Sequence, residues 1–289
     1  MSDVTDRPAL RASVLRDLLL APAGPLARVE LVERTGSTNS DLVAAVQADP
    51  AAWPDASLLV ADHQSVGRGR AGRSWETPAR SSLTMSFALR PQTPPASYGW
   101  LPLVAGLGAV HALRATAGVP AALKWPNDLM LPAVDGTEVA GWGPLRKVGG
   151  VLTELVRTEE GDVVVVGIGI NVSQTPAELP VPSATSLARA GAVDPDRELL
   201  LVALVTSLAE VLDRWRAHGA DPVGSGIADE VAAVCATLGT RVRVELPGGG
   251  EILGTARRLD DEGALVVVDD MGAEHHVLAG DVRHVRAAG

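Results

Sequence analysis

Lysine is nearly absent from this sequence of 289 residues. Only Lys124 and Lys147 are lysines, and the other 23 of the 25 basic residues are arginines. Acidic residues number 35, which gives a formal charge of −10. Proteins that bind nucleic-acid backbones use net basic surfaces, and aromatic residues that could stack on bases make up only 3% of this chain. The composition therefore argues against DNA as a partner.

Cysteine, long apolar runs and a targeting signal are also lacking. Cys235 is the single cysteine, so no internal disulfide can form, and no Cys/His cluster has the spacing of metal ligands. The longest apolar stretches, residues 100–113 and 163–170, fall short of the roughly 18 residues that a membrane span needs. The first six residues carry two aspartates and no basic residue, so they do not resemble a secretory signal. We therefore expect a soluble, cytoplasmic protein with no membrane partner.

Predicted strands and helices alternate from residue 28 onward. Strands are expected over residues 28–33, 57–61, 82–89, 147–156 and 162–172. Helices are expected around residues 42–46, over residues 100–117 with a stop at Gly118, and from Asp194-Pro195 to just before Gly219. Residues 163–166 are four valines without polar alternation, so their strand should be central in a sheet, with both faces covered.

The two ends of the chain differ from this middle part. One helix is expected over residues 9–20, followed by a stretch rich in proline and glycine. After Cys235, four short strands over residues 241–246, 251–259, 264–269 and 275–278 alternate with turns. The sequence therefore predicts a short N-terminal helical extension (1–28), an α/β middle domain (29–235) and a small all-β module of SH3-like size (236–289).

The segment from Gln64 to Trp75 carries three glycines with the spacing of a dinucleotide-binding loop. Gly67, Gly69 and Gly72 follow a predicted strand, but a dinucleotide-binding loop should open a helix, and this one leads into another strand. A P-loop is excluded as well, because no Gly-Lys-Ser/Thr follows. A Rossmann fold is therefore not favoured.

Three arginines alternate with these glycines. Arg68, Arg70 and Arg73 offer planar, permanently charged groups that match phosphate oxygens, and glycine lets the backbone fold closely around a ligand. The alternative is a flexible, solvated loop. Three neighbouring arginines repel one another unless solvent, acidic groups or an anion compensates, so the segment predicts a site for a polyphosphate.

Both lysines lie in segments that could form a site. Lys124 begins Lys124-Trp125-Pro126-Asn127-Asp128, and Lys147 stands at the head of an apolar strand with two glycines after it. An exposed turn and a solvated strand edge are the plain alternatives. In a chain that uses arginine nearly everywhere else, a retained lysine points to a need for a compact ammonium rather than a planar guanidinium.

Two further segments place small polar groups at the ends of elements. Asn171 closes the strand at residues 162–172, where its amide could contact a base or a ribose, or merely start a turn. Residues 35–39 gather hydroxyl and amide groups at the start of a helix, and ordinary capping explains one of them but not all.

Together these segments closely resemble the biotin protein ligases of bacteria. The resemblance covers residue 29 to the C-terminus, and its motifs follow in order: Ser37-Thr38-Asn39, the segment from Gln64 to Trp75, the two lysine segments, Gly167-Ile168-Gly169-Ile170-Asn171-Val172 and Ala184-Thr185-Ser186-Leu187. It implies an α+β fold, in which a catalytic domain with a mixed sheet and packed helices, like that of class II aminoacyl-tRNA synthetases, precedes an SH3-like barrel. It also implies that biotin reacts with Mg-ATP to give biotinyl-5′-AMP and pyrophosphate, and that biotin then passes to a lysine of a biotin carboxyl carrier protein.

The resemblance carries roles over to individual residues. The residues implied for biotin are Ser37, Thr38, Asn39, Gln64, Arg68, Gly69, Arg70 and Lys147. The residues implied for ATP are Arg70, Arg73, Trp75, Lys124, Asn127, Asp128 and Asn171. Lys147, Arg68 and Arg70 are expected to act in catalysis, with Lys147 holding the biotin carboxylate. No residue is assigned to a metal, because magnesium is expected to enter with ATP.

The chain departs from the family pattern in two respects. Residues 132–146 lengthen the connection before Lys147, and the N-terminal part lacks the DNA-binding module of the family members that repress transcription. We therefore expect a ligase that does not bind an operator. The rival interpretations are a lipoate ligase, which shares the general chemistry, and a non-enzymatic sensor of biotin or nucleotide.

Overall fold

A seven-stranded sheet forms the centre of the protein, which a computed structural model describes over residues 7–284. Only β1 and β2 pair in parallel, and every other neighbouring pair is antiparallel, so the sheet is mixed, as predicted. In spatial order the strands are β1 (Arg28–Thr35), β2 (Ser57–Gln64), β5 (Ser82–Leu89), β9 (Gly161–Asn171), β8 (Leu145–Thr158), β7 (Asp128–Pro132) and β6 (Ala122–Lys124).

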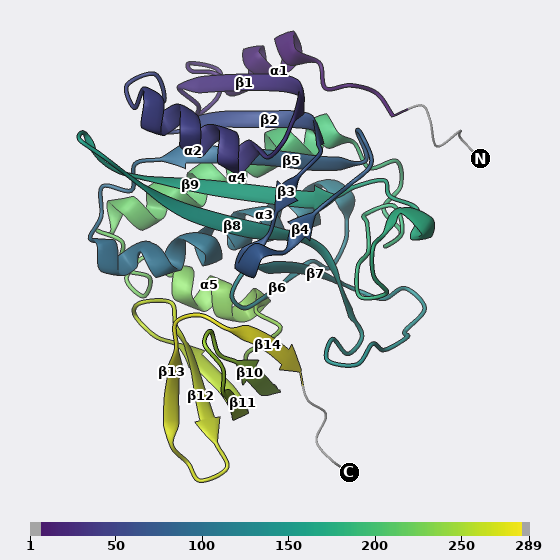
Figure 1. Cartoon of the computed structure of the whole chain (residues 1–289), viewed down its shortest axis with the longest axis vertical. Helices are drawn as coiled ribbons and strands as arrows, with labels where there is room; N and C mark the ends of the chain where they lie inside the picture. Colours follow the sequence, from purple (N-terminus) through teal and green to yellow (C-terminus); the bar gives the residue numbers. More distant parts are fainter. Residues whose placement is uncertain (1–6, 285–289) are drawn as a thin grey trace.

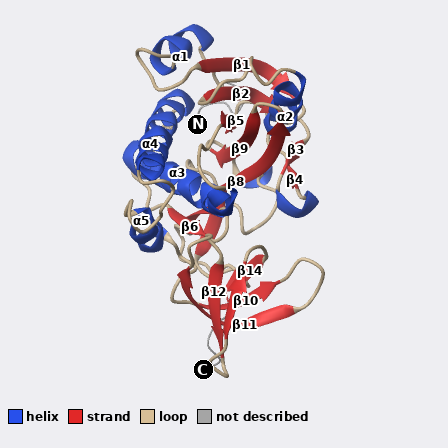
Figure 2. Cartoon of the chain, turned by 90° about the vertical axis from the view of Figure 1, so that its left-hand side faces the viewer, coloured by secondary structure: helices blue, strands red, loops and turns tan. Residues whose placement is uncertain are grey.

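The valine run in β9 is buried on both faces of the sheet, as predicted. Val164 and Val166 belong to the large core beneath α3 (Leu101–Ala117) and α4 (Arg197–Ala217). Val163 and Val165 belong to the smaller core on the opposite face, where α2 (Thr38–Ala48) packs. Figure 2 shows α3 and α4 on one side of the sheet and α2 on the other. The alternation of a strand thus places successive valines in two different cores.

Helix α3 is strongly apolar, and it packs against both the sheet and α4. Together with the preceding turn it forms the segment Pro95–Ala117, which is long and apolar enough to cross a membrane by length and composition, although 67% of its apolar window is buried inside the protein. It ends at Gly118, whose φ of 63° is the left-handed conformation expected of a helix stop. Helix α4 begins later than predicted, because Asp196 caps it by accepting from the backbone N–H groups of Glu198 and Leu199 at 2.7 and 3.2 Å.

The C-terminal part forms a five-stranded antiparallel sheet after a short helix, α5 (Ile227–Val234), that the sequence pattern did not reveal. Four of its strands were predicted, and the fifth, β14, was missed because its four residues carry one apolar side chain. The order is β13 (Glu274–Val277), β12 (Leu265–Asp269), β11 (Glu251–Leu259), β10 (Arg241–Glu245) and β14 (Asp281–His284). The small all-β domain is therefore confirmed, and in Figure 1 β14 lies on its upper side, toward β6 and β7.

Two buried tryptophans attach this small domain to the rest of the chain. The indole N–H of Trp100 donates to the carbonyl of Asp261 at 2.9 Å, and that of Trp125 donates to the carbonyl of Gly263 at 3.1 Å. Both side chains are 1% exposed. Because buried indole N–H groups need a partner, these bonds fix one turn of the small domain against the central domain. The boundary at residue 235 stays a prediction.

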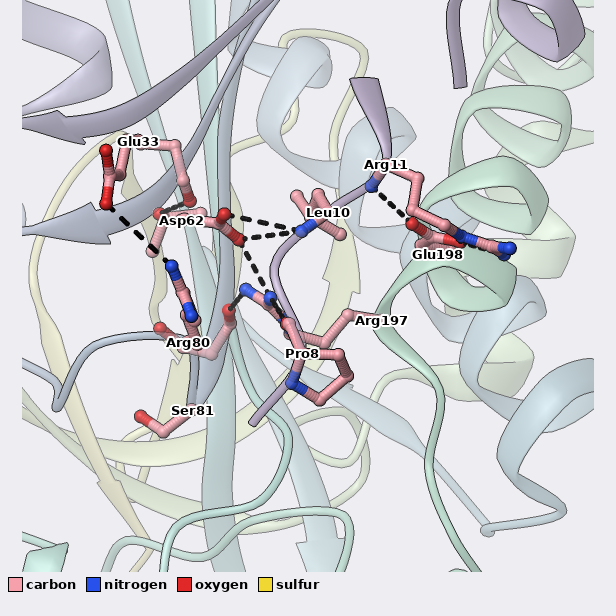
Figure 3. Close-up of polar contacts among 12 residues, drawn as sticks. Pro8, Leu10, Arg11, Glu33, Asp62, Arg80, Ser81, Arg197 and Glu198 are labelled. Atoms are coloured by element: carbon pink, nitrogen blue, oxygen red, sulfur yellow. Dashed lines mark hydrogen bonds and ion pairs between the residues drawn. The ribbon is translucent and has the colours of Figure 1, made fainter. Parts of the chain in front are cut away.

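The N-terminal helix α1 (Ala12–Leu19) lies within the predicted range 9–20 and is held to the central domain through a buried ion pair. Arg197 donates to Asp62 at 2.8 Å, and the two side chains are 7% and 9% exposed. Figure 3 shows the segment before α1 crossing this pair, with Arg197 also donating to the carbonyl of Pro8 at 2.6 Å and the N–H of Leu10 donating to Asp62 at 3.2 Å. The pair therefore ties the N-terminal segment to β2 and α4.

Candidate active site

A cavity of about 710 Å³ lies over the face of the seven-stranded sheet on which α2 packs. It is bordered by α2, the glycine–arginine segment and β14. All fourteen residues proposed from the sequence line it, although they come from five separate segments of the chain. They are Ser37, Thr38, Asn39, Gln64, Arg68, Gly69, Arg70, Arg73, Trp75, Lys124, Asn127, Asp128, Lys147 and Asn171.

The start of α2 supplies one wall. Ser37 is the N-cap and accepts from the N–H of Ser40 at 3.4 Å, which is the ordinary capping role that the sequence allowed. Thr38 instead faces Gln64 at the end of β2, and both its N–H and its hydroxyl donate to Gln64 Oε1, at 2.8 and 3.1 Å. Capping therefore accounts for Ser37 but not for Thr38.

Asn39 is fixed by protein groups on both ends of its amide. Its oxygen accepts from the hydroxyl of Ser86 at 2.6 Å, and its nitrogen donates to the carbonyl of Leu152 at 3.2 Å and to Glu154 at 2.9 Å. A side chain at Gly167 would reach within 2.1 Å of the Asn39 amide oxygen. Asn39 therefore fastens α2 to the sheet, and its suggested contact with biotin stays a prediction.

The glycine–arginine segment forms a small hairpin rather than an open loop. Strand β3 (Gly67–Arg68) pairs with β4 (Ser74–Trp75), and a single 3-10 turn joins them. A Cβ at Gly67 would lie 2.2 Å from the carbonyl oxygen of Trp75, so only glycine fits there. No α-helix follows, which agrees with the exclusion of a Rossmann loop.

The three arginines of this hairpin point to three different partners. Arg68 contacts Glu154 at 3.2 Å, Arg70 donates to the amide oxygen of Asn127 at 3.1 Å, and Arg73 pairs with Asp281. Arg70 is the most enclosed of the three, and burial lowers its pKa. The repulsion among the three arginines is therefore compensated in part by acidic and amide groups, which come from other parts of the chain.

The two lysines of the chain meet at one carboxylate. Lys147 Nζ lies 2.5 Å from Asp128 Oδ1, and Lys124 Nζ lies 4.0 Å from Asp128 Oδ2. Lys124 is 4% exposed, and burial lowers its pKa while Asp128 opposes that effect. A small cluster of one carboxylate and two ammonium groups thus occupies the end of the cavity near β6, β7 and β8.

Trp75 covers the middle of the sheet at Gly169. A Cβ at Gly169 would stand 3.0 Å from the indole ring, so the absence of a side chain there lets the ring lie against the strand. The ring centre is 5.8 Å from Lys147 Nζ, and the indole nitrogen is buried without a hydrogen-bond partner among the described residues. The ring therefore forms a flat floor beside the ammonium group.

The two asparagines predicted for nucleotide contacts are both held by the protein. Asn127 donates to the carbonyl of Val151 at 2.7 Å and accepts from Arg70. Asn171 donates to the carbonyl of Thr185 at 2.9 Å and accepts from Gln174 at 2.9 Å. Thr185 lies in the segment that the family resemblance had singled out, and its N–H donates to the carbonyl of Lys147 at 2.8 Å. These amides position the loops around Lys147.

Sequence reasoning missed several residues of the site that come from the small domain and from residues 132–146. Asp281 and Arg283 of β14 and Trp142 line the cavity. His284, also on β14, is half-buried, and this partial burial together with the nearby Lys124 lowers its pKa to about 4. The unusual length of residues 132–146 was the one signal that could have pointed to Trp142, and nothing local marked β14.

The comparisons with known proteins agree with this geometry. A model of the biotin/lipoate A/B protein ligase family matches residues 31–171, and a model of the biotin protein ligase C-terminal domain matches residues 237–285. The fold and the cavity thus define a ligase of the class that attaches biotin or lipoate to proteins.

Individual relatives narrow this class. A biotin–[acetyl-CoA-carboxylase] ligase of Mycobacterium tuberculosis is 39% identical over 97% of both chains. The bifunctional ligase/repressor BirA of Bacillus subtilis is 32% identical over 76% of this chain and 63% of its own length. A biotin protein ligase of Aquifex aeolicus, solved in complex with biotin and ATP, superposes with a TM-score of 0.72 at 28% identity, covering 90% of this chain and 100% of that one. This chain belongs to the biotin protein ligase family.

Proposed function

We propose that this protein is an ATP-dependent biotin–[acetyl-CoA-carboxylase] ligase (EC 6.3.4.15), in keeping with the relatives named above. In the first step an oxygen of the biotin carboxylate attacks the α-phosphorus of ATP, the bond to the bridging oxygen breaks, and pyrophosphate leaves. In the second step the amine of a carrier lysine attacks the acyl carbon of biotinyl-5′-AMP. AMP leaves, and the amine gives up a proton.

The observation that carries this proposal is the concentration of positive charge in the cavity. Arg70, Arg73, Lys124 and Lys147 all line it in a chain of net charge −10, and Asp128 is the carboxylate that both lysines share. This group of cations suits a ligand with several phosphoryl oxygens. Phosphoryl transfer depends on cations that are positioned at those oxygens.

The biotin end of the cavity is the one formed by α2 and β2. Because Gln64 Oε1 accepts from Thr38, its amide nitrogen is the donor that Gln64 would present to the ureido oxygen of biotin. Ser37, Thr38 and Gln64 would satisfy the buried ureido group, and Arg68 and Gly69 would close over it. Lys147 lies on β8 beside Asp128, where it would hold the carboxylate and then the acyl-phosphate oxygen.

The ATP end lies between the hairpin and β7. Arg70, Arg73 and Lys124 would bind phosphate oxygens, and Trp75 would lie against the adenine, with Asn127 and Asn171 bracing the loops. Within residues 7–284 there is no group of three metal-binding side chains, and Asp128 already faces two ammonium groups. This donor set suits a magnesium ion that is bound mainly by phosphate oxygens and water and so enters with ATP, neutralising phosphate charge.

Biotin-dependent exchange of labelled pyrophosphate into ATP tests the first step. Exchange that requires both biotin and ATP supports the ligase, whereas binding of biotin without exchange would favour a sensor. Mass spectrometry of a carrier domain incubated with ATP and either biotin or lipoate tests the second step. A carrier that gains lipoate instead of biotin would overturn the choice of substrate.

Two further properties are proposed from the sequence. We expect the protein to act in the cytoplasm, where cell fractionation should find it. We also expect no binding to operator DNA, in keeping with the net charge of −10. A gel-shift assay in which the protein retards a specific DNA fragment in the presence of biotin and ATP would contradict the second expectation.

A further inference from the structure

The connection between β7 and β8 is an ordered, internally bonded loop rather than a slack insertion. Val139 and Gly143 exchange backbone hydrogen bonds of 3.0 and 2.9 Å, and the N–H of Trp142 donates to the carbonyl of Val139 at 2.9 Å. Arg146 is 6% exposed and donates to the carbonyls of Gly143 and Thr137 at 3.1 and 2.9 Å. The backbone around Trp142 is therefore held in one conformation.

The same loop is attached to the small domain. The N–H of His284 on β14 donates to the carbonyl of Gly141 at 3.2 Å, and the side chain of Arg283 packs within 3.6 Å of where a Cβ at Gly141 would lie. Trp142 follows directly in the chain and lines the cavity. The loop thus bridges the two domains at the rim of the cavity, beside the cluster of cations.

Trp142 presents its ring to one of those cations. The ammonium nitrogen of Lys124 lies 4.9 Å from the ring centre of Trp142, within the range at which an aromatic face attracts a cation. Asp128 pairs with Lys124 at 4.0 Å, and it also pairs with Lys147 at the shorter distance of 2.5 Å. Three neighbouring cations, Lys147, Arg73 and Arg70, repel it. Without the ring, the ammonium of Lys124 would lose an attractive contact and keep its pairing with Asp128 at 4.0 Å.

We propose that Trp142 is a positioning residue, which holds the Lys124 ammonium at the phosphate end of the cavity and closes the rim there against water. The inference rests on the proposed function, because it assumes that Lys124 meets the phosphates of ATP. Trp142 acts through Lys124, so its loss should weaken the use of ATP and leave the biotin wall of α2 and β2 unchanged.

Two substitutions separate the aromatic face from simple packing. Trp142→Phe keeps a ring over Lys124, whereas Trp142→Leu keeps an apolar side chain without one. We expect Trp142→Leu to raise the KM for ATP in biotin-dependent pyrophosphate exchange about tenfold, with a smaller change in kcat and an unchanged KM for biotin. Trp142→Phe should stay within about threefold of the original protein. Val134→Ala, in the same loop but 73% exposed and outside the cavity lining, is the matched control.

Calorimetric binding of a non-hydrolysable ATP analogue gives a second measure that does not depend on turnover. It should show the same order: original protein and Trp142→Phe similar, Trp142→Leu about tenfold weaker. Equal ATP parameters for Trp142→Leu and the original protein would overturn the inference, as would a parallel loss for biotin and ATP. Absence of exchange in the original protein would instead contradict the proposed function, so the two failures are distinguishable.

Discussion

Replacing Lys147 with arginine tests whether the compact ammonium, and not merely a positive charge, is needed at this position. Lys147 Nζ sits 2.5 Å from Asp128 Oδ1, and a Cβ at Gly150 would touch both Nζ and Cε of Lys147 at 3.3 Å. The lysine side chain therefore occupies the space that is left free because residue 150 is a glycine. A guanidinium is wider and planar, so in Lys147→Arg the charge should be displaced from the place where the carboxylate and acyl-phosphate oxygens react.

The expected loss can be estimated from the role of such a group. Removing one positioned donor from a developing oxyanion costs about a hundredfold to a thousandfold in kcat, or about 2.7–4 kcal/mol. Lys147→Arg keeps the charge but misplaces it, so we expect a loss at the lower end, about a hundredfold. Gly150→Ala keeps the ammonium and crowds it by a few tenths of an ångström, so it should cost less, about tenfold.

The measurement is the kcat of biotin-dependent pyrophosphate exchange at saturating ATP and biotin. Arg258→Lys is a suitable control, because Arg258 is half-exposed on β11 of the small domain and pairs there with Glu274. Unchanged melting temperatures would show that the variants are folded. If Lys147→Arg turned over at nearly the original rate, or if Gly150→Ala were the worse of the two, Lys147 would not hold the reacting oxygen.

Three further predictions concern other charged groups of the protein. Arg197→Met should lower the free energy of unfolding in urea by about 3–5 kcal/mol, because Asp62 would be left buried without its counter-charge, and adding Asp62→Asn should recover part of that loss. Lys124→Met should raise the melting temperature at pH 7 while impairing exchange, because burial lowers the pKa of Lys124 and the fold therefore disfavours its charged form. This gain in melting temperature should shrink as the pH rises toward 10.5, the ordinary pKa of lysine. Arg7 holds the pKa of Glu178 at about 2, below the ordinary 4.5, so the stability from that carboxylate is complete above pH 4.5 and is lost as the pH falls toward 2. Arg7→Gln should therefore cost about 1 kcal/mol at pH 6, and thermal melts should show that difference vanishing between pH 4.5 and 2.

The sequence by itself determined the type of most elements and the chemistry of the site. Four consecutive valines predicted the central strand β9, and the structure places alternate ones in two cores. The strand predicted after the glycine–arginine segment, where a dinucleotide-binding loop would open a helix, argued against a Rossmann fold. The retention of two lysines pointed to two of the segments that meet at the cavity. These features could be predicted because they depend on local pattern: side-chain alternation, turn residues and charge type are visible within a few residues.

Only the tertiary structure decided which of these groups meet and what completes them. Lys147 and Asp128 lie on neighbouring strands whose register shifts between Leu129 and Met130, and that shift is set by the whole sheet. Trp142 and Asp281 reach the cavity through a loop and a four-residue strand whose own sequences carry no functional pattern. Their places follow from the docking of the small domain by long-range hydrogen bonds, so no reading of neighbouring residues could supply them. The local pattern indicated each lysine separately, and only the fold brings both of them to the carboxylate of Asp128.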